Sequence, residues 1–253
     1  MIFNYNDKAI HYNSYGKGPA VLLLHGFLES STMWKPLIPF ISEKNSVIVI
    51  DLPGHGKSDW IAENHTMELM AEVVFSILDD LNIDKLKIIG HSMGGYIALA
   101  FIEAYESKVE ELILLNSTSS EDSPERRINR TRALSIIEKN HTPYVQMAIK
   151  NLFPEVTHEQ YASEIKMLKK EALHFPVEGI KAAIRGMRDR KNRNEVLKFF
   201  GNKKTMVSGL IDPIIPYKDS VLEALHTNTE LKTVSGGHMS LIENLEKIKS
   251  ICL

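Results

Sequence analysis

The strongest chemical signal in the sequence is a serine between two glycines at a predicted strand-to-helix turn. Gly90-His91-Ser92-Met93-Gly94 follows the apolar run Leu86–Ile89 and precedes a segment with helical spacing. A serine at such a turn takes up a strained backbone conformation, and its hydroxyl projects into a cleft above the sheet. The glycines on either side let neighbouring backbone pass without a Cβ clash. We therefore predict that Ser92 is a nucleophile.

A nucleophilic serine needs a base, and one of the ten histidines is suitably placed. His238 lies between the last predicted strand and the last predicted helix, and loops after the carboxyl ends of strands meet at the ligand cleft of such sheets. A carboxylate must hold the imidazole tautomer, and Asp212 follows the predicted strand Lys204–Val207. Asn116, at the other place from which an acid could come, is not a carboxylate. The alternatives are a helix N-cap for His238 and a turn residue for Asp212.

Attack on a carbonyl group also needs hydrogen-bond donors for the oxyanion that forms in the transition state. One donor is predicted to be the backbone N–H of Met93, the residue after the nucleophile. The second is predicted to be the N–H of Phe27, in the loop after the apolar run Ala20–Leu24. Phe27 could equally be only a wall residue of the pocket.

Short apolar runs alternate along the first half of the chain with segments of helical spacing. The runs have strand length and are mostly aliphatic, as expected for parallel strands buried on both faces. The predicted strands are Ala20–Leu24, Ser46–Ile50, Leu86–Ile89 and Leu112–Leu115. The predicted helices are Thr32–Ile41, which Pro36 interrupts, Met67–Leu81 and Tyr96–Tyr105. This alternation predicts an α/β fold with a mostly parallel, doubly wound sheet, and Ile2–Tyr15 adds an antiparallel hairpin at one edge.

The alternation stops after residue 116. Residues 117–200 carry helical signals and no convincing strand, and Ser123 before Pro124 and Thr157 are predicted helix caps. The chain then resumes with strand-like runs and a closing helix, at Lys204–Val207, Glu230–Val234 and Leu241–Ile251. We therefore predict a core of residues 1–116 and 201–253, with a helical lid inserted at residues 117–200.

The predicted lid differs from the rest of the chain in charge. It carries 16 Lys and Arg against 11 Asp and Glu, whereas the whole chain has a formal net charge of −2. Solvated helix faces would account for this excess, and so would an electropositive lid that attracts an anionic substrate. Both interpretations stay open at this point.

Several of these motifs together resemble the α/β-hydrolase fold superfamily. They are His25-Gly26-Phe27, Asp51-Leu52-Pro53-Gly54-His55-Gly56-Lys57-Ser58, Gly90-His91-Ser92-Met93-Gly94-Gly95, Asp212 before a proline, and Gly237-His238. The resemblance covers the chain outside the predicted lid, and it implies an α/β-hydrolase fold with a helical cap at the position of the lid. It also implies that Asp51 and His55 shape the core rather than act as catalytic residues.

Other classes of site lack support in the sequence. The histidines are scattered without metal-ligand spacing, and no glycine-rich phosphate loop is present, so we expect no metal and no cofactor. The charge balance gives no general attraction to nucleic acid, and no apolar run approaches the roughly 20 residues of a membrane helix. Because Cys252 is the only cysteine and the N-terminus does not resemble a signal peptide, we expect a cytoplasmic location. We expect a monomer or homodimer that binds a small-molecule substrate.

The predicted function is cleavage of a small-molecule ester, thioester or lactone through an acyl-enzyme on Ser92. Haloalkane dehalogenases and epoxide hydrolases resemble this chain, but they are disfavoured because they place aspartate where Ser92 stands. One alternative is a C–C bond hydrolase or lyase acting on a small anionic substrate. It predicts that a lid arginine, Arg126, Arg127 or Arg130, points into the pocket. Another alternative is a ligand-sensing protein with slow turnover.

Overall fold

The strands form one eight-stranded sheet. In the computed structural model, which describes residues 1–253, they are β1 (Ile2–Tyr5), β2 (Lys8–Tyr15), β3 (Ala20–Leu24), β4 (Ser46–Ile50), β5 (Leu86–His91), β6 (Val109–Leu115), β7 (Lys203–Gly209) and β8 (Glu230–Val234). Their order across the sheet is β1-β2-β4-β3-β5-β6-β7-β8. The pairs β1–β2 and β2–β4 are antiparallel and all other pairs are parallel. The predicted α/β fold is therefore confirmed, including the antiparallel hairpin at its edge.

Side chains of the central strands alternate between two apolar cores, one on each face of the sheet. In β3, Leu22 and Leu24 belong to the larger core, whereas Val21 and Leu23 belong to the smaller one. The other central strands alternate in the same way. Burial on both faces explains why these strands are continuous aliphatic runs in the sequence.

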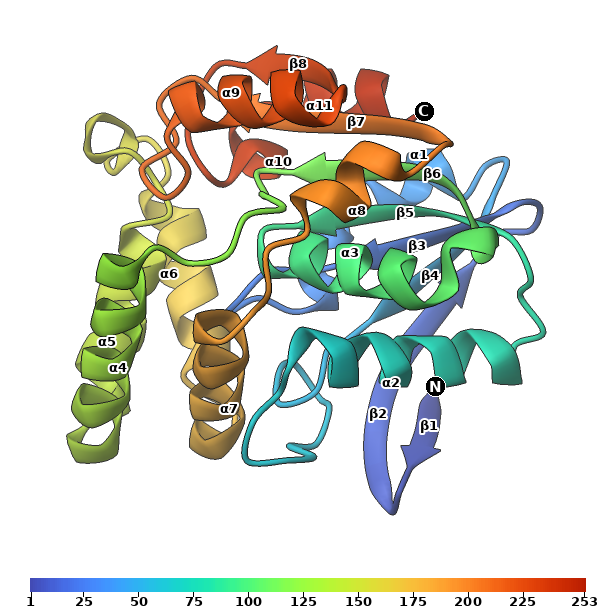
Figure 1. The fold of residues 1–253 in the computed structure, drawn as a ribbon. Helices are drawn as coiled ribbons and strands as arrows, with labels where there is room; N and C mark the ends of the chain where they lie inside the picture. The colour runs from blue at the N-terminus through green and yellow to red at the C-terminus, as the bar shows by residue number, and fades with distance from the viewer.

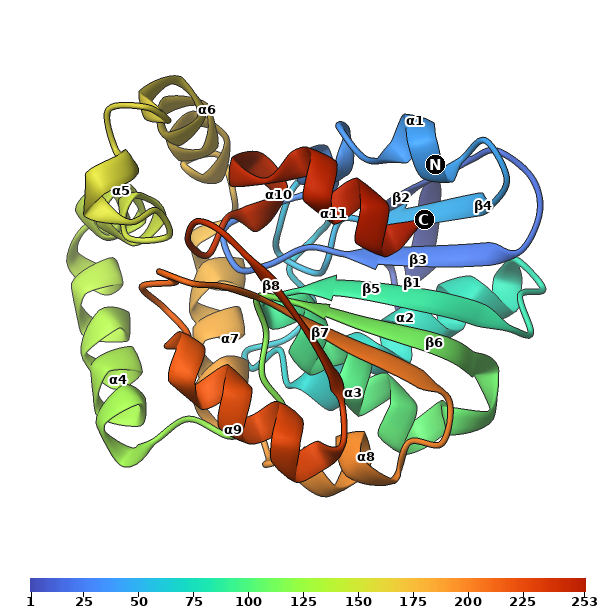
Figure 2. The same ribbon diagram turned by 90° about the horizontal axis from the view of Figure 1, so that it is seen from above.

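Helices cover both faces of this sheet (Figures 1 and 2). Those outside the β6–β7 connection are η1 (Ser31–Trp34), α1 (Ile38–Ile41), α2 (Met67–Asp80), α3 (Met93–Tyr105), η2 (Glu106–Lys108), α9 (Tyr217–Thr227), α10 (Ser240–Glu243) and α11 (Leu245–Cys252). The larger core lies under α2 and α3, where Val74 and Phe101 are fully buried. The smaller core lies under η1, α1 and α11, which contribute Trp34 and Ile248.

The long connection between β6 and β7 contains helices and no strand, as predicted. It contains α4 (Pro124–Lys139), α5 (His141–Lys150), η3 (Glu155–Thr157), α6 (Ala162–Ala172), α7 (Val177–Arg188) and α8 (Asn194–Phe199). Helices α4 to α7 pack on one another beyond the carboxyl ends of the parallel strands (Figure 1). Helix α8 instead packs against α9 and α3, and the division into a core and a lid at residues 117–200 stays a prediction. No helix of the chain combines the length and the apolar character that crossing a bilayer requires.

The capping predictions had mixed outcomes. Ser123 Oγ accepts a hydrogen bond from the Arg126 N–H at 3.2 Å, and Pro124 is the first residue of α4, as predicted. The prediction for Thr157 was wrong, because its hydroxyl donates to the Pro154 carbonyl and α6 begins five residues later without a side-chain cap. The predicted closing helix is likewise divided, at Asn244, into α10 and α11.

Candidate active site

Ser92 occupies a strained turn between β5 and α3. Its backbone has φ 49° and ψ −114°. Residues other than glycine rarely have such a positive φ. The Ser92 N–H donates to the Leu115 carbonyl at 3.0 Å, which fixes the turn to the neighbouring strand β6. A Cβ atom on Gly94 would overlap the Leu24 carbonyl, so the glycine after the turn is sterically required. The tight packing therefore holds the serine side chain in one place above the sheet.

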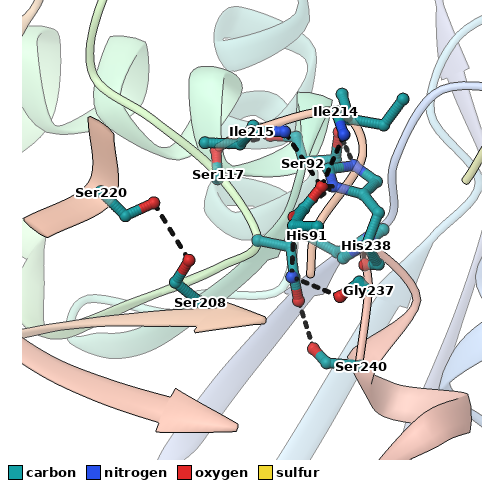
Figure 3. A network of polar contacts seen from close by, with 12 residues as sticks. His91, Ser92, Ser117, Ser208, Ile214, Ile215, Ser220, Gly237, His238 and Ser240 are labelled. Atoms are coloured by element: carbon teal, nitrogen blue, oxygen red, sulfur yellow. Dashed lines mark hydrogen bonds and ion pairs between the residues drawn. The ribbon is translucent and has the colours of Figure 1, made fainter. Parts of the chain in front are cut away.

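His238 contacts both Ser92 and Asp212, and Figure 3 shows His238 beside Ser92. The Ser92 hydroxyl and His238 Nε2 are 2.9 Å apart, and His238 Nδ1 lies 2.9 and 3.1 Å from the two Asp212 carboxylate oxygens. The His238 and Asp212 side chains are both buried. Because a carboxylate only accepts hydrogen bonds, Nδ1 carries the proton and Nε2 is free to accept one from the serine. The structure thus brings together all three residues that the sequence analysis singled out.

Asp212 remains ionised despite its burial. Burial acts to raise the pKa of this carboxyl, but His238, by charge and by hydrogen bonding, and the Ile215 N–H and Asn116 amide bring the pKa below its ordinary value. The N–H groups of Ile214 and Ile215 donate to one carboxylate oxygen at 2.8 and 2.9 Å. A charged Asp212 can therefore stabilise an imidazolium at His238.

Asn116 supports this acid, a role that the sequence analysis missed. Its amide nitrogen donates to Asp212 and to the Gly237 carbonyl, each at 3.0 Å, and its carbonyl oxygen accepts from the Ser240 hydroxyl. Asn116 therefore joins the loop that carries the acid to the loop that carries His238. Its φ of 45° falls in the left-handed region that asparagine tolerates better than most residues. The available signal was its position directly after the end of β6.

The two predicted oxyanion donors lie on opposite sides of Ser92 in the chain. Met93 is the first residue of α3, where backbone N–H groups have no partner within the helix. Phe27 lies in the loop after β3, and its side chain lines the cavity in front of Ser92. His25 holds this loop, because its Nε2 accepts from the Leu52 N–H at 2.9 Å and its Nδ1 donates to the Gly26 carbonyl at 2.7 Å. The roles of Met93 and Phe27 as donors stay predictions.

A buried histidine–glutamate pair lies directly behind the site, and the sequence analysis missed it as well. His91 Nδ1 donates to Glu29 at 2.9 Å, and His91 Nε2 donates to the His238 carbonyl at 2.9 Å. Glu29 also accepts from the Gly26 N–H at 2.6 Å, so the pair connects the loop that carries Phe27 to His238. Both partners of His91 are acceptors, which fits an imidazolium facing a carboxylate.

The electrostatics of this pair agree with that assignment. Burial acts to lower the pKa of His91, but the charge and hydrogen bond of Glu29 raise the pKa above its ordinary value. Burial likewise acts to raise the pKa of Glu29, and His91 brings that pKa below its ordinary value. The pair therefore holds opposite charges beside the catalytic candidates.

A cavity of about 460 Å³ opens in front of Ser92 and His238. Its apolar wall includes Phe27, Tyr96, Met147, Leu152 and Met187. Three larger hollows, of about 790, 800 and 490 Å³, lie elsewhere on the molecule, and neither Ser92 nor His238 lines them. We place the functional site at the cavity of about 460 Å³ because it alone of these four is lined by the nucleophile candidate Ser92.

Two of the three candidate lid arginines reach this cavity. Arg126 and Arg130 line it, whereas Arg127 does not and forms an ion pair with Glu121 in an exposed position. No group of three or more His, Cys, Asp or Glu side chains is arranged to hold a metal ion. The site therefore combines a serine, a histidine and an aspartate with a partly cationic wall.

Comparison with known proteins gives a family match over most of the chain. Residues 19–245 match the family profile described as alpha/beta hydrolase fold. A 2-hydroxy-6-oxononadienedioate/2-hydroxy-6-oxononatrienedioate hydrolase of Pseudomonas putida is 35% identical over 124 residues, 47% of this chain and 44% of that protein. An uncharacterized protein of Mycobacterium tuberculosis is 35% identical over 102 residues, 40% of this chain and 30% of that protein. The chain thus matches less than half the length of these curated relatives.

Similar solved structures cover the whole chain. An esterase from Thermogutta terrifontis is 28% identical, with a TM-score of 0.92 over 100% of this chain and 96% of that chain. The enol-lactonase from Burkholderia xenovorans has a TM-score of 0.91 over 100% of this chain and 98% of that chain, and at 19% identity this likeness concerns the fold alone.

Proposed function

The chain belongs to the alpha/beta hydrolase fold family, and on that premise we propose that it is a serine hydrolase of small-molecule esters, thioesters or lactones. The proposal depends most on the two hydrogen bonds that join Ser92 to Asp212 through His238, each 2.9 Å long. Ser92 and His238 line a cavity of about 460 Å³, which is within the size range of small-molecule sites. The similarity to the Thermogutta terrifontis esterase supports the same reaction class.

In the proposed first half-reaction, Ser92 Oγ forms a bond to the carbonyl carbon while its proton passes to His238 Nε2. Asp212 stabilises the resulting imidazolium, and the N–H groups of Met93 and Phe27 donate to the oxyanion. When the tetrahedral intermediate collapses, the bond to the leaving oxygen or sulfur breaks and His238 gives its proton to that atom. For a lactone, the leaving oxygen stays attached to the acyl chain.

The second half-reaction releases the acyl group. His238 takes a proton from a water molecule, whose oxygen attacks the acyl carbon bound to Ser92. The same donors hold the second oxyanion. The bond to Ser92 Oγ then breaks, His238 returns the proton to the serine, and a carboxylic acid is released.

A panel of chromogenic esters, thioesters and lactones tests this proposal with the Ser92→Ala variant. Loss of the nucleophile should lower kcat by about 10⁶, as in comparable triads. Ser76→Ala is the matched control, because Ser76 is an α2 residue whose hydroxyl bonds only the Glu72 carbonyl. Full activity of Ser92→Ala, or no turnover of any compound by the unmodified protein, would show that the proposal is wrong.

A second candidate function is hydrolysis of a C–C bond in an anionic substrate. Two observations favour it, namely the name of the Pseudomonas putida relative and the presence of Arg126 and Arg130 in the cavity wall. The dienedioate in that relative's name is the test compound, and chromatographic separation of substrate and products measures its cleavage. Turnover of this compound at a higher kcat/KM than any ester would favour the second function. If neither the esters nor this compound is turned over, the result favours a ligand-sensing protein.

A further inference from the structure

Three arginines surround one buried carboxylate at the lid side of the cavity. Asp122 is fully buried, and it accepts hydrogen bonds from Arg130 Nε and, at 2.6 Å, from Arg190 Nη1. Arg126 Nε lies 3.9 Å from the same carboxylate. The pKa of Asp122 lies below its ordinary value, because the charges and hydrogen bonds of Arg130 and Arg190 outweigh burial, which acts to raise it. The cluster therefore contains three positive charges and one negative charge.

Arg190 is held by the protein through its Nε and Nη1 atoms. Besides Asp122, it donates to the Met187 carbonyl at 2.8 Å and to the Ser120 carbonyl at 3.1 Å, and its guanidinium stacks on Tyr96 at 4.2 Å. Its side chain is buried and does not line the cavity. Arg190 alone can therefore neutralise Asp122, and two positive charges remain on Arg126 and Arg130.

Arg130 has hydrogen-bond donors to spare. Its only hydrogen bond to the protein uses Nε, so neither terminal amino group has a protein acceptor. Its side chain is 18% exposed and lines the cavity. Arg126 is 37% exposed and donates through Nη2 to the Ile214 carbonyl at 3.1 Å, which leaves Nη1 without an acceptor. These three amino groups have no acceptor in the protein, and both arginines line the cavity.

Helix spacing places these groups on the cavity side of the lid. The cavity-lining residues of α4 are Arg126, Asn129, Arg130 and Ala133, which share one helix face. Helix α5 adds a similar row, with Tyr144, Met147 and Ala148, and Asn151 directly after the helix also lines the cavity. The Tyr144 hydroxyl has no hydrogen-bond partner in the protein, and burial raises the pKa of Tyr144. Neutral donors therefore accompany the two arginines on this wall.

No free carboxylate of the protein opposes these cations inside the cavity. Glu29 lines it but accepts from His91 and the Gly26 N–H, and Asp212 accepts from His238 and Asn116. A planar guanidinium matches a carboxylate with two parallel hydrogen bonds. A singly charged carboxylate also loses less hydration energy on burial than a phosphate dianion does.

We propose that Arg130, assisted by Arg126, forms a carboxylate-binding subsite in the Ser92 cavity. The preferred substrates then carry a carboxylate in addition to the bond that is cleaved. This inference rests on the proposed hydrolase function and specifies its substrate class. It also explains part of the excess positive charge of the lid, because these two arginines line the substrate cavity.

Two chromogenic esters of equal acyl length test the subsite. We expect kcat/KM for mono-4-nitrophenyl adipate, which ends in a carboxylate, to exceed kcat/KM for 4-nitrophenyl hexanoate. In Arg130→Gln, kcat/KM for the adipate ester should fall about 10- to 100-fold, the range for hydrogen bonds to a charged group. The hexanoate value should change less than about twofold. Arg127→Gln, on the same helix but outside the cavity, should leave both values unchanged.

The possible failures are distinguishable. If Ser92-dependent turnover is equal for the two esters, or if Arg130→Gln lowers both values alike, the subsite is wrong and the hydrolase function stands. If neither ester is cleaved, the hydrolase function fails, and calorimetric binding of free adipate to the unmodified protein and to Arg130→Gln decides about the subsite. If both proteins bind adipate with equal affinity, or if neither binds it, the proposed subsite is wrong. Should Arg130→Gln not fold, Arg126→Gln replaces it, with the same expected direction and a smaller effect.

Discussion

The pair of His91 and Glu29 predicts a specific dependence of stability on pH. Both groups are buried, and the charged titratable groups near the His91 ring are Glu29 and Asp212, with His238 and His25 close by. We propose the substitution His91→Gln. Glutamine replaces the imidazole with a neutral amide donor of similar size and removes the positive charge. The substitution leaves the buried Glu29 carboxylate with the Gly26 N–H and the neutral glutamine amide as donors, and with no positive charge beside it.

The expected cost follows from the fate of that carboxylate. Removing one partner of a buried ion pair typically costs about 3 to 5 kcal/mol, because an uncompensated charge stays in the interior. Since glutamine can still donate one hydrogen bond, we expect a loss at the lower end, about 3 kcal/mol near pH 6. The double variant Glu29→Gln/His91→Gln should be no less stable than His91→Gln alone, because it contains no buried charge at this position.

The pH range follows from the directions of the two pKa shifts. The folded pKa of His91 is raised, so its contribution is fully present below the unfolded value of about 6.5 and is lost as pH rises through the folded value. The folded pKa of Glu29 is lowered, so its contribution is present above the unfolded value of about 4.3 and is lost as pH falls through the folded value. The pair should stabilise the fold most between about pH 4.3 and 6.5.

Urea unfolding between about pH 4 and pH 9 measures this dependence. The free-energy difference between the unmodified protein and His91→Gln should be largest in that window and should shrink at higher pH. His141→Gln serves as control, since this partly exposed lid histidine has no side-chain hydrogen bond. A difference that stays constant across the pH range, or one that grows above pH 6.5, would refute the assignment of an ion pair.

Two other substitutions test the local geometry. Asn116→Ala removes the amide that donates to Asp212, and we expect kcat for hexanoate ester hydrolysis to fall about 10- to 100-fold with little change in KM; an unchanged kcat with a raised KM would contradict this. Gly94→Ala places a Cβ against the Leu24 carbonyl, and thermal unfolding should show a loss of about 1 to 3 kcal/mol or more. Gly201→Ala, where nothing lies within 4 Å, is the control and should stay within about 0.5 kcal/mol.

The sequence was sufficient to predict the strands and the proximity of Ser92, His238 and Asp212, for a physical reason. Strands buried on both faces must be aliphatic along their whole length, and such runs are bounded clearly in the chain. Ser92, Asp212 and His238 each follow the carboxyl end of one of these strands, and in a parallel sheet those ends lie along one edge. Local pattern and spatial position therefore coincide for the fold and for these three residues.

The features that the sequence did not predict depend on contacts between distant segments. Glu29 and His91 are 62 residues apart, and Asn116 and Asp212 are 96 residues apart, so no local spacing connects them. Thr157 has the residue type of a cap, but its hydroxyl bonds the Pro154 carbonyl and the next helix begins elsewhere. The sequence also left open which arginine of α4 lines the cavity. Arg126, Arg127 and Arg130 differ only in their position around the helix axis.

The central claim is that Ser92 is a nucleophile that His238 activates. A fluorophosphonate probe followed by peptide mapping tests it directly, because the probe bonds covalently to an activated serine. We predict that the probe labels Ser92 and that His238→Ala slows labelling about 10²- to 10⁴-fold, the contribution of a general base. Labelling at another residue, or an unchanged rate in His238→Ala, would contradict the account.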